Sequence, residues 1–200
     1  MKNKKGNELS GIFWIILIII CLILAIFVGF LFVEFGKQKD IVIDKEENGG
    51  NIVLNYTNNI TGLYITKAIP TNDAIGMKLN NEGQYFDFAI DTKLDNATSI
   101  DYEIAVIKDE KKSTIPDSDI RIYLEKEVSG TYTKVFGPAE FKGIKEESKL
   151  GSEKGSMILS NVTTKKSAVD NYRLRLWLSD SSTLQSGDYA VEVVVNGKAN

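Results

Sequence analysis

The sequence contains no histidine, and Cys21 is its only cysteine. Without histidine the chain cannot form a Ser-His-Asp or Cys-His nucleophile, and it offers no imidazole ligand to a metal ion. One cysteine cannot form a disulfide within a single chain. The sequence therefore excludes several common hydrolase and metal chemistries, and any folded domain in it is stabilised by its core without a covalent cross-link.

Charge is absent from one long stretch near the N-terminus. Residues 11–33 are 23 consecutive uncharged residues, most of them apolar. A helix of this length measures about 34 Å, which is enough to cross a hydrocarbon core of about 30 Å. We therefore predict a short tail at residues 1–10 and a transmembrane helix at residues 11–33 that contacts the lipid bilayer.

The charges beside this helix predict its orientation. Lys2, Lys4 and Lys5 precede it, whereas acidic and basic residues are balanced after it. An excess of basic residues on a short flank is typical of the cytoplasmic side. The N-terminal tail is therefore expected in the cytoplasm, and residues 34–200 are expected outside the cell membrane.

A cleaved secretory signal peptide is the alternative interpretation of this segment. Signal peptides have an apolar region of about 7–15 residues and small residues at the cleavage site. Here the apolar run is longer, and Phe30, Phe32 and Glu34 are too large for that site. Cys21 does not fit a lipoprotein site either, because Ile20 stands where a small residue is needed. The segment is better explained as an uncleaved signal anchor.

Residues 34–51 have the composition of a linker with one short apolar piece. Charged residues and a Gly-Gly pair surround Ile41–Ile43, which predicts a flexible spacer containing one edge strand. Three alternatives are open for this piece: it pairs with its own domain, it fills the sheet edge of a second copy of the chain, or it is disordered.

The part of the chain beyond the helix is weakly acidic. Residues 36–200 hold 21 of the 24 Lys and Arg residues and 25 of the 27 Asp and Glu residues, with the two signs interleaved. No basic stripe is present, so we expect no nucleic-acid partner. An exported domain without disulfides is typical of a Gram-positive bacterial surface.

Apolar residues in residues 52–200 recur mainly with a period of two. Phe86, Phe88 and Ile90, for example, alternate with polar or small residues, and turn residues such as Ser129-Gly130 separate the apolar segments. Repeated half-buried strands are typical of an antiparallel two-layer β-sandwich, of which the jelly roll is one form. The best helical candidate, residues 142–149, is short and charged and is equally explained as a loop. The segments predicted as strands are 52–56, 63–65, 85–91, 100–106, 120–125, 132–136, 157–159, 172–178 and 189–195.

Three residues of the penultimate strand form the candidate interaction face. Arg173, Arg175 and Trp177 alternate with the apolar residues that define the core side of this strand. Arginine and tryptophan are enriched at binding hot spots, so an exposed face of this kind would bind a protein or a carbohydrate. A cross-strand stacking pair, or a central strand with a covered outer face, explains the same pattern without a partner.

Acidic residues offer no convincing metal or catalytic site. Asp87 and Asp91 lie on one face of a predicted strand, about 13 Å apart, which is too far for one ion. Asp117 and Asp119 alternate in a turn and are explained either as weak calcium ligands or as turn-forming residues. No pair of carboxylates stands out as a glycosidase pair. We predict no catalytic residue, no metal, no cofactor and no enzymatic activity.

Four segments resemble a known type of exported domain. The pattern across 69–76 and 85–90, together with the later segments 115–124 and 171–178, is similar to the TasA/camelysin type of β domain in low-GC Gram-positive bacteria. This resemblance implies a jelly-roll sandwich and a role in the biofilm matrix. Its motifs describe strands, so it implies no role for any single residue.

These observations together predict a membrane-anchored structural or interaction protein of the cell surface, which acts in adhesion, matrix assembly or envelope assembly. The alternative is a carbohydrate-binding module that uses an exposed aromatic face around Trp177.

Overall fold

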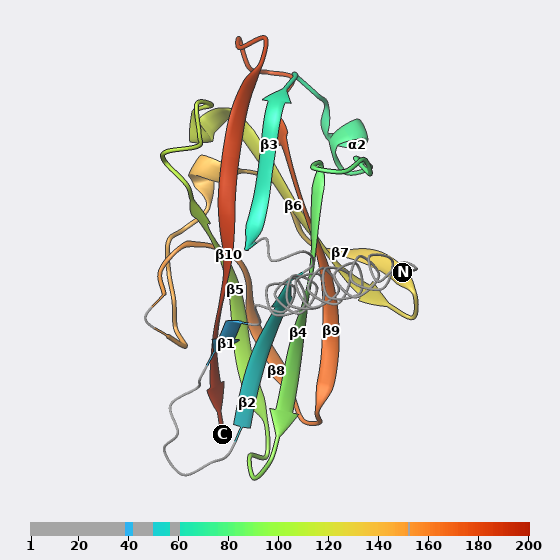
Figure 1. Cartoon of the computed structure of the whole chain (residues 1–200), viewed down its shortest axis with the longest axis vertical. Helices are drawn as coiled ribbons and strands as arrows, with labels where there is room; N and C mark the ends of the chain where they lie inside the picture. The colour runs from blue at the N-terminus through green and yellow to red at the C-terminus, as the bar shows by residue number, and fades with distance from the viewer. Residues whose placement is uncertain (1–38, 42–49, 57–60, 152) are drawn as a thin grey trace, which may run out of the picture. The chain divides into compact units, whose positions relative to one another are not determined.

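A computed structural model of the protein describes residues 39–41, 50–56, 61–151 and 153–200 (Figure 1). The predicted cytoplasmic tail and the predicted transmembrane run, residues 1–10 and 11–33, lie outside the described residues. Among the described residues, no helix is long and apolar enough to cross a membrane.

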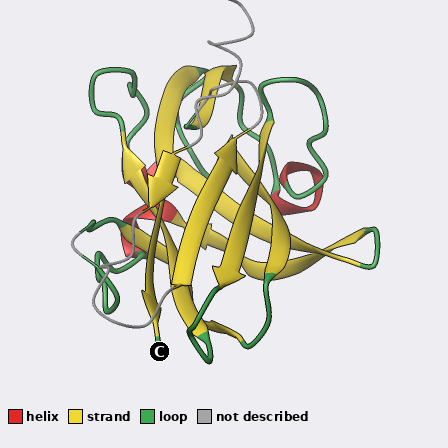
Figure 2. Ribbon diagram, turned by 60° about the horizontal axis from the view of Figure 1, so that its bottom comes forward, coloured by secondary structure: helices red, strands yellow, loops and turns green. Residues whose placement is uncertain are grey.

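The described residues form ten strands in two antiparallel sheets, which confirms the predicted all-β sandwich (Figure 2). One sheet has six strands in the order β1-β2-β4-β9-β6-β7, and the other has four in the order β3-β10-β5-β8. The strands are β1 (Lys39–Ile41), β2 (Gly50–Tyr56), β3 (Gly62–Ala68), β4 (Tyr85–Leu94), β5 (Ile100–Lys108), β6 (Ile120–Val128), β7 (Thr131–Glu140), β8 (Ser156–Thr164), β9 (Ala168–Leu178) and β10 (Gly187–Ala199).

The period-two pattern marks the side chains that fill the space between the sheets. On β4, Phe86, Phe88 and Ile90 are buried, and on the neighbouring β9 so are Tyr172 and Leu174. The rings of Phe86 and Phe88 stack with their centroids 5.6 Å apart, and those of Phe88 and Tyr172 with theirs 5.5 Å apart. Each strand predicted from alternation is present because it supplies one apolar face to this core.

Most connections cross from one sheet to the other. Only β1–β2 and β6–β7 are consecutive strands within one sheet. The β6–β7 hairpin turns at Ser129 and Gly130, where φ is 53° and 79°. Positive φ at both central residues of a two-residue loop matches the twist of a tight hairpin. The Ser-Gly pair therefore has the local role that the sequence indicated.

Strand β10 is buried on both faces because it is a central strand with a covered outer side. On the inner face Val193 and Val195 contact the core, and on the outer face Val194 and Asn196 are also buried. The Nδ2 atom of Asn196 donates to the carbonyl oxygen of Glu153, in the connection between β7 and β8. Apolar residues occur on both faces of this strand because the core packs on one face and the connection between β7 and β8 covers the other.

The edge strand predicted from the sequence is present, whereas the helical candidate at residues 142–149 is not a helix. β1 pairs antiparallel with β2 of the same chain, Ile41 opposite Ile52, so the edge strand predicted within residues 34–51 joins its own domain. The described residues form one compact unit. Residues 142–149 form no α-helix, and only a 3-10 turn at Phe141–Gly143 overlaps them.

Candidate functional site

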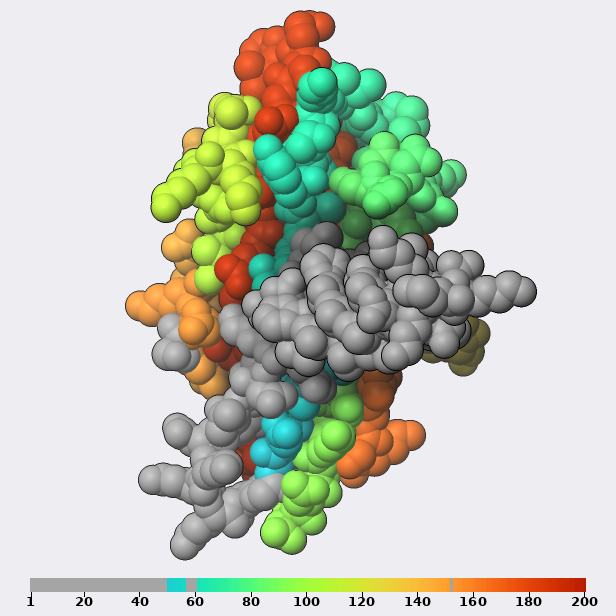
Figure 3. Space-filling model, viewed as in Figure 1, coloured from blue at the N-terminus to red at the C-terminus, as the bar shows by residue number. Residues whose placement is uncertain are grey.

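The predicted interaction face lies on the outer side of β9 beneath another part of the chain. Trp177 is 2% exposed and Arg175 is 5% exposed. Residues 69–84, which we call the covering segment, connect β3 to β4 and reach the surface next to β3 (Figure 3). Of the explanations that the sequence offered for the Arg-x-Arg-x-Trp pattern, the central strand with a covered outer face therefore holds at Arg175 and Trp177, and the exposed face does not, because this segment covers the end of β9 that carries Trp177.

A short helix brings the covering segment against the tryptophan ring. This helix, α2 (Asp73–Gly76), begins at Asn72, whose Oδ1 accepts a hydrogen bond from the backbone N–H of Ile75 at 3.0 Å. Asparagine is among the preferred residues at this capping position. At Gly76, a Cβ atom would lie 2.3 Å from the ring of Trp177, so the backbone contacts the indole directly.

One arginine of β6 and one of β9 hold the covering segment. Arg121 donates through Nε and Nη2 to the carboxylate of Asp73, at 3.1 and 2.8 Å. Arg175 donates through Nε to the carbonyl oxygen of Leu79 at 2.7 Å, and its Nη1 bonds to Glu125. The hydrogen-bond donors Nε and Nη1 of Arg175 are therefore both used within the fold.

Arg173 is also engaged within the chain. Its Nε and Nη2 each donate to the carboxylate of Asp87 at 2.7 Å. The rings of Tyr85 and Tyr132 lie 4.3 Å from its guanidinium carbon, which gives two cation–π contacts. Hydrogen bonding to Asp87 raises the pKa of Arg173 above its ordinary value. Arg173, Arg175 and Trp177 therefore lie side by side on the outer face of β9, and each of them contacts other residues of the same chain.

The candidate calcium ligands are likewise engaged with neighbouring side chains. Asp117 accepts from the hydroxyl of Tyr189 and from Nζ of Lys108, both at 2.9 Å. Asp119 accepts from the hydroxyl of Ser182 at 2.5 Å. Among the described residues, no group of three or more Cys, Asp or Glu side chains is arranged to hold a metal ion.

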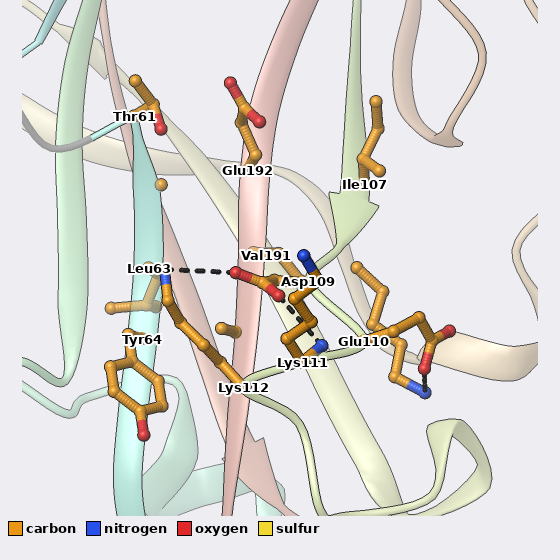
Figure 4. A pocket seen from close by; sticks show the side chains of 13 residues that line it. Thr61, Leu63, Tyr64, Ile107, Asp109, Glu110, Lys111, Lys112, Val191 and Glu192 are labelled. Atoms are coloured by element: carbon orange, nitrogen blue, oxygen red, sulfur yellow. Dashed lines mark hydrogen bonds and ion pairs between the residues drawn. The ribbon is translucent and has the colours of Figure 1, made fainter.

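An accessible hollow formed by described residues lies elsewhere, on the outer side of the four-stranded sheet. We call it the Tyr64 pocket; its volume is about 570 Å³, within the range of ligand-binding pockets. β10 forms its floor, β3 forms one wall, and the end of β5 with the following turn forms the other (Figure 4). Residues that line it include Gly62, Tyr64, Ile107, Asp109, Ala190 and Glu192.

The pocket is hollow because small residues lie between larger ones. Ala190 of β10 lies opposite Tyr64 of β3, and Gly62 lies opposite Glu192. Neither of these small residues fills the space beside Tyr64. The tyrosine itself is therefore 43% exposed. The sequence carries no local sign of this pocket, because the hollow depends on the pairing of two strands more than one hundred residues apart in the chain.

Hydrogen bonds and ion pairs hold the turn that forms the second wall. Asp109 accepts from Nζ of Lys112 at 3.1 Å and from the backbone N–H of Lys111 at 3.0 Å. The bond to Lys112 is the main cause that lowers the pKa of Asp109. Burial disfavours the charge of Lys108, yet its bonds to Asp117 and Glu110 raise its pKa. The wall thus carries fixed charges of both signs near neutral pH.

Comparison with known proteins gives no family. No protein-family model matches the chain, and no curated protein matches it.

Proposed function

We propose that the chain is a membrane-anchored protein of the bacterial cell surface, with a structural or interaction role in adhesion, matrix assembly or envelope assembly and no catalytic activity. In this proposal, residues 11–33 anchor it in the bilayer as a single-pass helix. The tail at residues 1–10 lies in the cytoplasm, and the sandwich lies outside. Residues 34–51 connect the helix to the body of the sandwich and supply β1 to the edge of one sheet.

The observation that carries this proposal is the order of two segments. An uncharged run of 23 residues, preceded by three lysines, stands before a single antiparallel sandwich that begins at β1. Such a run is long enough to span a bilayer, and the flanking lysines favour an N-in, C-out orientation. A sandwich displayed in this way presents its outer faces and loops to partners.

The sandwich itself supports an exported interaction domain. Its core is built from both sheets without a disulfide, as expected of many Gram-positive surface domains. We further propose that it is a form of jelly roll, because consecutive strands alternate between the two sheets except at β1–β2 and β6–β7. The similarity of its strand motifs to the TasA/camelysin type, including a role in the biofilm matrix, belongs to the same proposal.

Protease accessibility tests the anchored topology. The full chain carries one epitope at each end and is expressed in a Gram-positive host, whose protoplasts are then treated with a protease. We expect the C-terminal epitope to be digested, the N-terminal epitope to be protected, and the protein to stay in the membrane fraction after alkaline carbonate extraction.

A matched variant with Ile19→Lys and Leu22→Lys serves as the control, because two charges at the centre of a spanning helix oppose insertion. This variant should leave the membrane fraction. Recovery of the unaltered chain in the soluble fraction, or protection of both epitopes, would show that the proposed anchor is wrong.

A further inference from the structure

The shape of the Tyr64 pocket is fixed by the backbone around its floor. A Cβ atom at Gly62 would lie 1.9 Å from the carbonyl oxygen of Val191 on β10, so a larger residue does not fit there without moving the sheet. The opposite wall is joined to β10 by the backbone N–H of Asp109, which donates to the carbonyl oxygen of Ala190 at 2.9 Å. The hollow is therefore preformed.

One wall presents an aromatic ring to the solvent. Tyr64 projects from β3 beside the pocket (Figure 4), and its hydroxyl donates to Oδ2 of Asp188 at 3.4 Å. Lys67, on the same strand, donates its backbone N–H to Oδ1 of Asp188 at 2.7 Å, which holds that carboxylate in place. The tyrosine is thus attached at its hydroxyl, while its ring remains available as a flat apolar surface.

The charges that line the pocket cancel. Three lysines and three carboxylates contribute to it, so neither a strongly anionic nor a strongly cationic ligand is favoured by net charge. Carboxylates accept hydrogen bonds and ammonium groups donate them, so a ligand meets both kinds of partner. Figure 4 shows the carboxylate of Asp109 over the floor strand, with Lys112 on one side of it and Lys111 on the other. The residues that carry this pattern are Lys108, Asp109, Glu110, Lys111, Lys112 and Glu192.

We propose that the Tyr64 pocket binds a neutral carbohydrate, with the apolar face of one sugar ring stacked on Tyr64 and hydroxyls along the bound oligosaccharide bonded to Asp109, Glu192 and Lys112. Sugar hydroxyls both donate and accept hydrogen bonds, and the C–H groups of a sugar ring form a flat apolar face. A neutral sugar therefore matches the aromatic wall, the balanced charge and the mixed donors and acceptors together. This gives the proposed interaction role a partner of stated chemistry.

Direct binding of neutral oligosaccharides tests the site. The full chain is purified in a detergent without a sugar headgroup and is titrated with cellotetraose, maltotetraose, laminaritetraose and N-acetylglucosamine tetramer. Calorimetry gives the affinity, and saturation-transfer NMR identifies the sugar protons that contact the protein. We expect at least one neutral oligosaccharide to bind, with the strongest transfer to ring C–H protons of one face.

Substitutions at the aromatic wall separate stacking from folding. Tyr64→Ala removes the ring and is expected to weaken binding about tenfold, the effect of losing one aromatic contact of roughly 1.4 kcal/mol. Tyr64→Phe keeps the ring and should bind like the unaltered chain. Tyr132→Ala removes a tyrosine from the outer face of the other sheet and should leave sugar affinity unchanged, which makes it the matched control.

Three results would overturn the proposal. They are the absence of binding to every neutral tetrasaccharide at millimolar concentration, equal affinity of the unaltered chain and Tyr64→Ala, or tighter binding of charged oligomers such as polygalacturonate or glucosamine tetramer. None of these results bears on the membrane anchor, which the protease experiment tests. Conversely, a soluble protein that binds a neutral sugar through Tyr64 would contradict only the anchor.

Discussion

Gly76 is the position where the lack of a side chain matters most to the covered face of β9. Its backbone lies against the Trp177 ring, and the indole N–H of Trp177 is buried without a hydrogen-bond partner among the described residues. An unpaired buried donor costs about 1–3 kcal/mol. The covering segment is therefore stabilised by close packing and by the arginine contacts, which must offset this cost.

Substitution of Gly76 tests how tight this packing is. In Gly76→Ala the new methyl group overlaps the Trp177 ring, and we expect a loss of about 1–3 kcal/mol in the free energy of unfolding, as for other overpacked sites. Urea unfolding followed by far-UV circular dichroism measures it. Gly143→Ala is the matched control, because a Cβ atom there meets nothing within 4 Å. Equal stability of the two variants would contradict the contact.

Two buried tyrosines connect the sheets through their hydroxyls. Tyr102 of β5 and Tyr172 of β9 lie with their oxygen atoms 2.6 Å apart, and Tyr102 donates to Oδ2 of Asp170 at 2.5 Å. Asp170 also pairs with Lys126, at 2.8 Å from Nζ to Oδ1. This chain of hydrogen bonds passes through an otherwise apolar interior, where lost partners are expensive.

Removal of one hydroxyl from this pair should destabilise the domain. Tyr102→Phe leaves the buried hydroxyl of Tyr172 without its partner, and we expect a loss of about 1–3 kcal/mol in the free energy of unfolding. Tyr132→Phe removes the hydroxyl of a partly exposed tyrosine and should change stability by much less. A thermal or urea melt compares them, and equal effects would argue against an energetic role for the tyrosine pair.

At the scale of elements, the connection between β7 and β8 is attached to the four-stranded sheet by one buried carboxylate. Glu103 of β5 is 1% exposed. It accepts hydrogen bonds from the backbone N–H groups of Lys149 and Leu150 and from the hydroxyl of Ser148. Lys149 and Leu150 belong to no strand. The carboxylate accepts their hydrogen bonds in place of the carbonyl oxygens that a paired strand would supply.

Loss of that carboxylate should loosen the connection. Glu103→Ala leaves the N–H groups of Lys149 and Leu150 unpaired, so we expect faster amide hydrogen exchange in residues 146–155, with protection elsewhere largely retained. Mass spectrometry of peptic peptides measures this exchange. Glu147→Gln changes an exposed acid of the same connection and should leave exchange as it is. Unchanged protection in Glu103→Ala would rule out the anchoring role.

At the scale of the whole molecule, the buried tyrosines link stability to alkaline pH. Burial is the main cause that raises the pKa of Tyr56 to about 12, with Glu192 adding to it. Burial also raises the pKa of Tyr102, Tyr172 and Tyr189. In an unfolded chain a tyrosine loses its proton near pH 10, whereas in the folded chain these tyrosines keep theirs. The contribution of these protonated tyrosines to the free energy of unfolding is therefore complete below pH 10, and it is lost as the pH rises above 10.

The expected result is a free energy of unfolding that falls steeply between about pH 10 and pH 12. Because Tyr56 titrates near pH 12 in the folded chain, Tyr56→Phe should make this slope shallower by about 1 kcal/mol per pH unit. Urea unfolding at several pH values measures both slopes. Identical slopes would show that Tyr56 has the same pKa in the folded and unfolded chains.

The sequence predicted the sandwich because burial of one face leaves a local trace. The alternation of Phe86, Phe88 and Ile90 can be seen without knowing the partner strand, and so can the Ser129-Gly130 turn. The α2 helix was missed because it is a single short turn, although Asn72 and Asp73 together are a recognisable start signal for a helix.

The exposure of the outer faces of the sheets could not be predicted in the same way. The sequence shows that Arg173, Arg175 and Trp177 share one side of a strand, but solvent exposure on that side depends on residues 69–84, which arrive from another part of the chain. The same holds for Tyr64, which is an unremarkable residue of a short strand until Ala190 is placed opposite to it. Exposure of an outer face is a tertiary property.

The sequence by itself therefore determined the class of fold, the strands and their core sides, and the presence of a long uncharged run before them. These properties depend on the periodicity and composition of neighbouring residues. Tertiary structure alone decided that β9 has a covered outer face and that the domain has a pocket at Tyr64. Both depend on contacts between segments far apart in the chain, for which a single sequence carries no local signal.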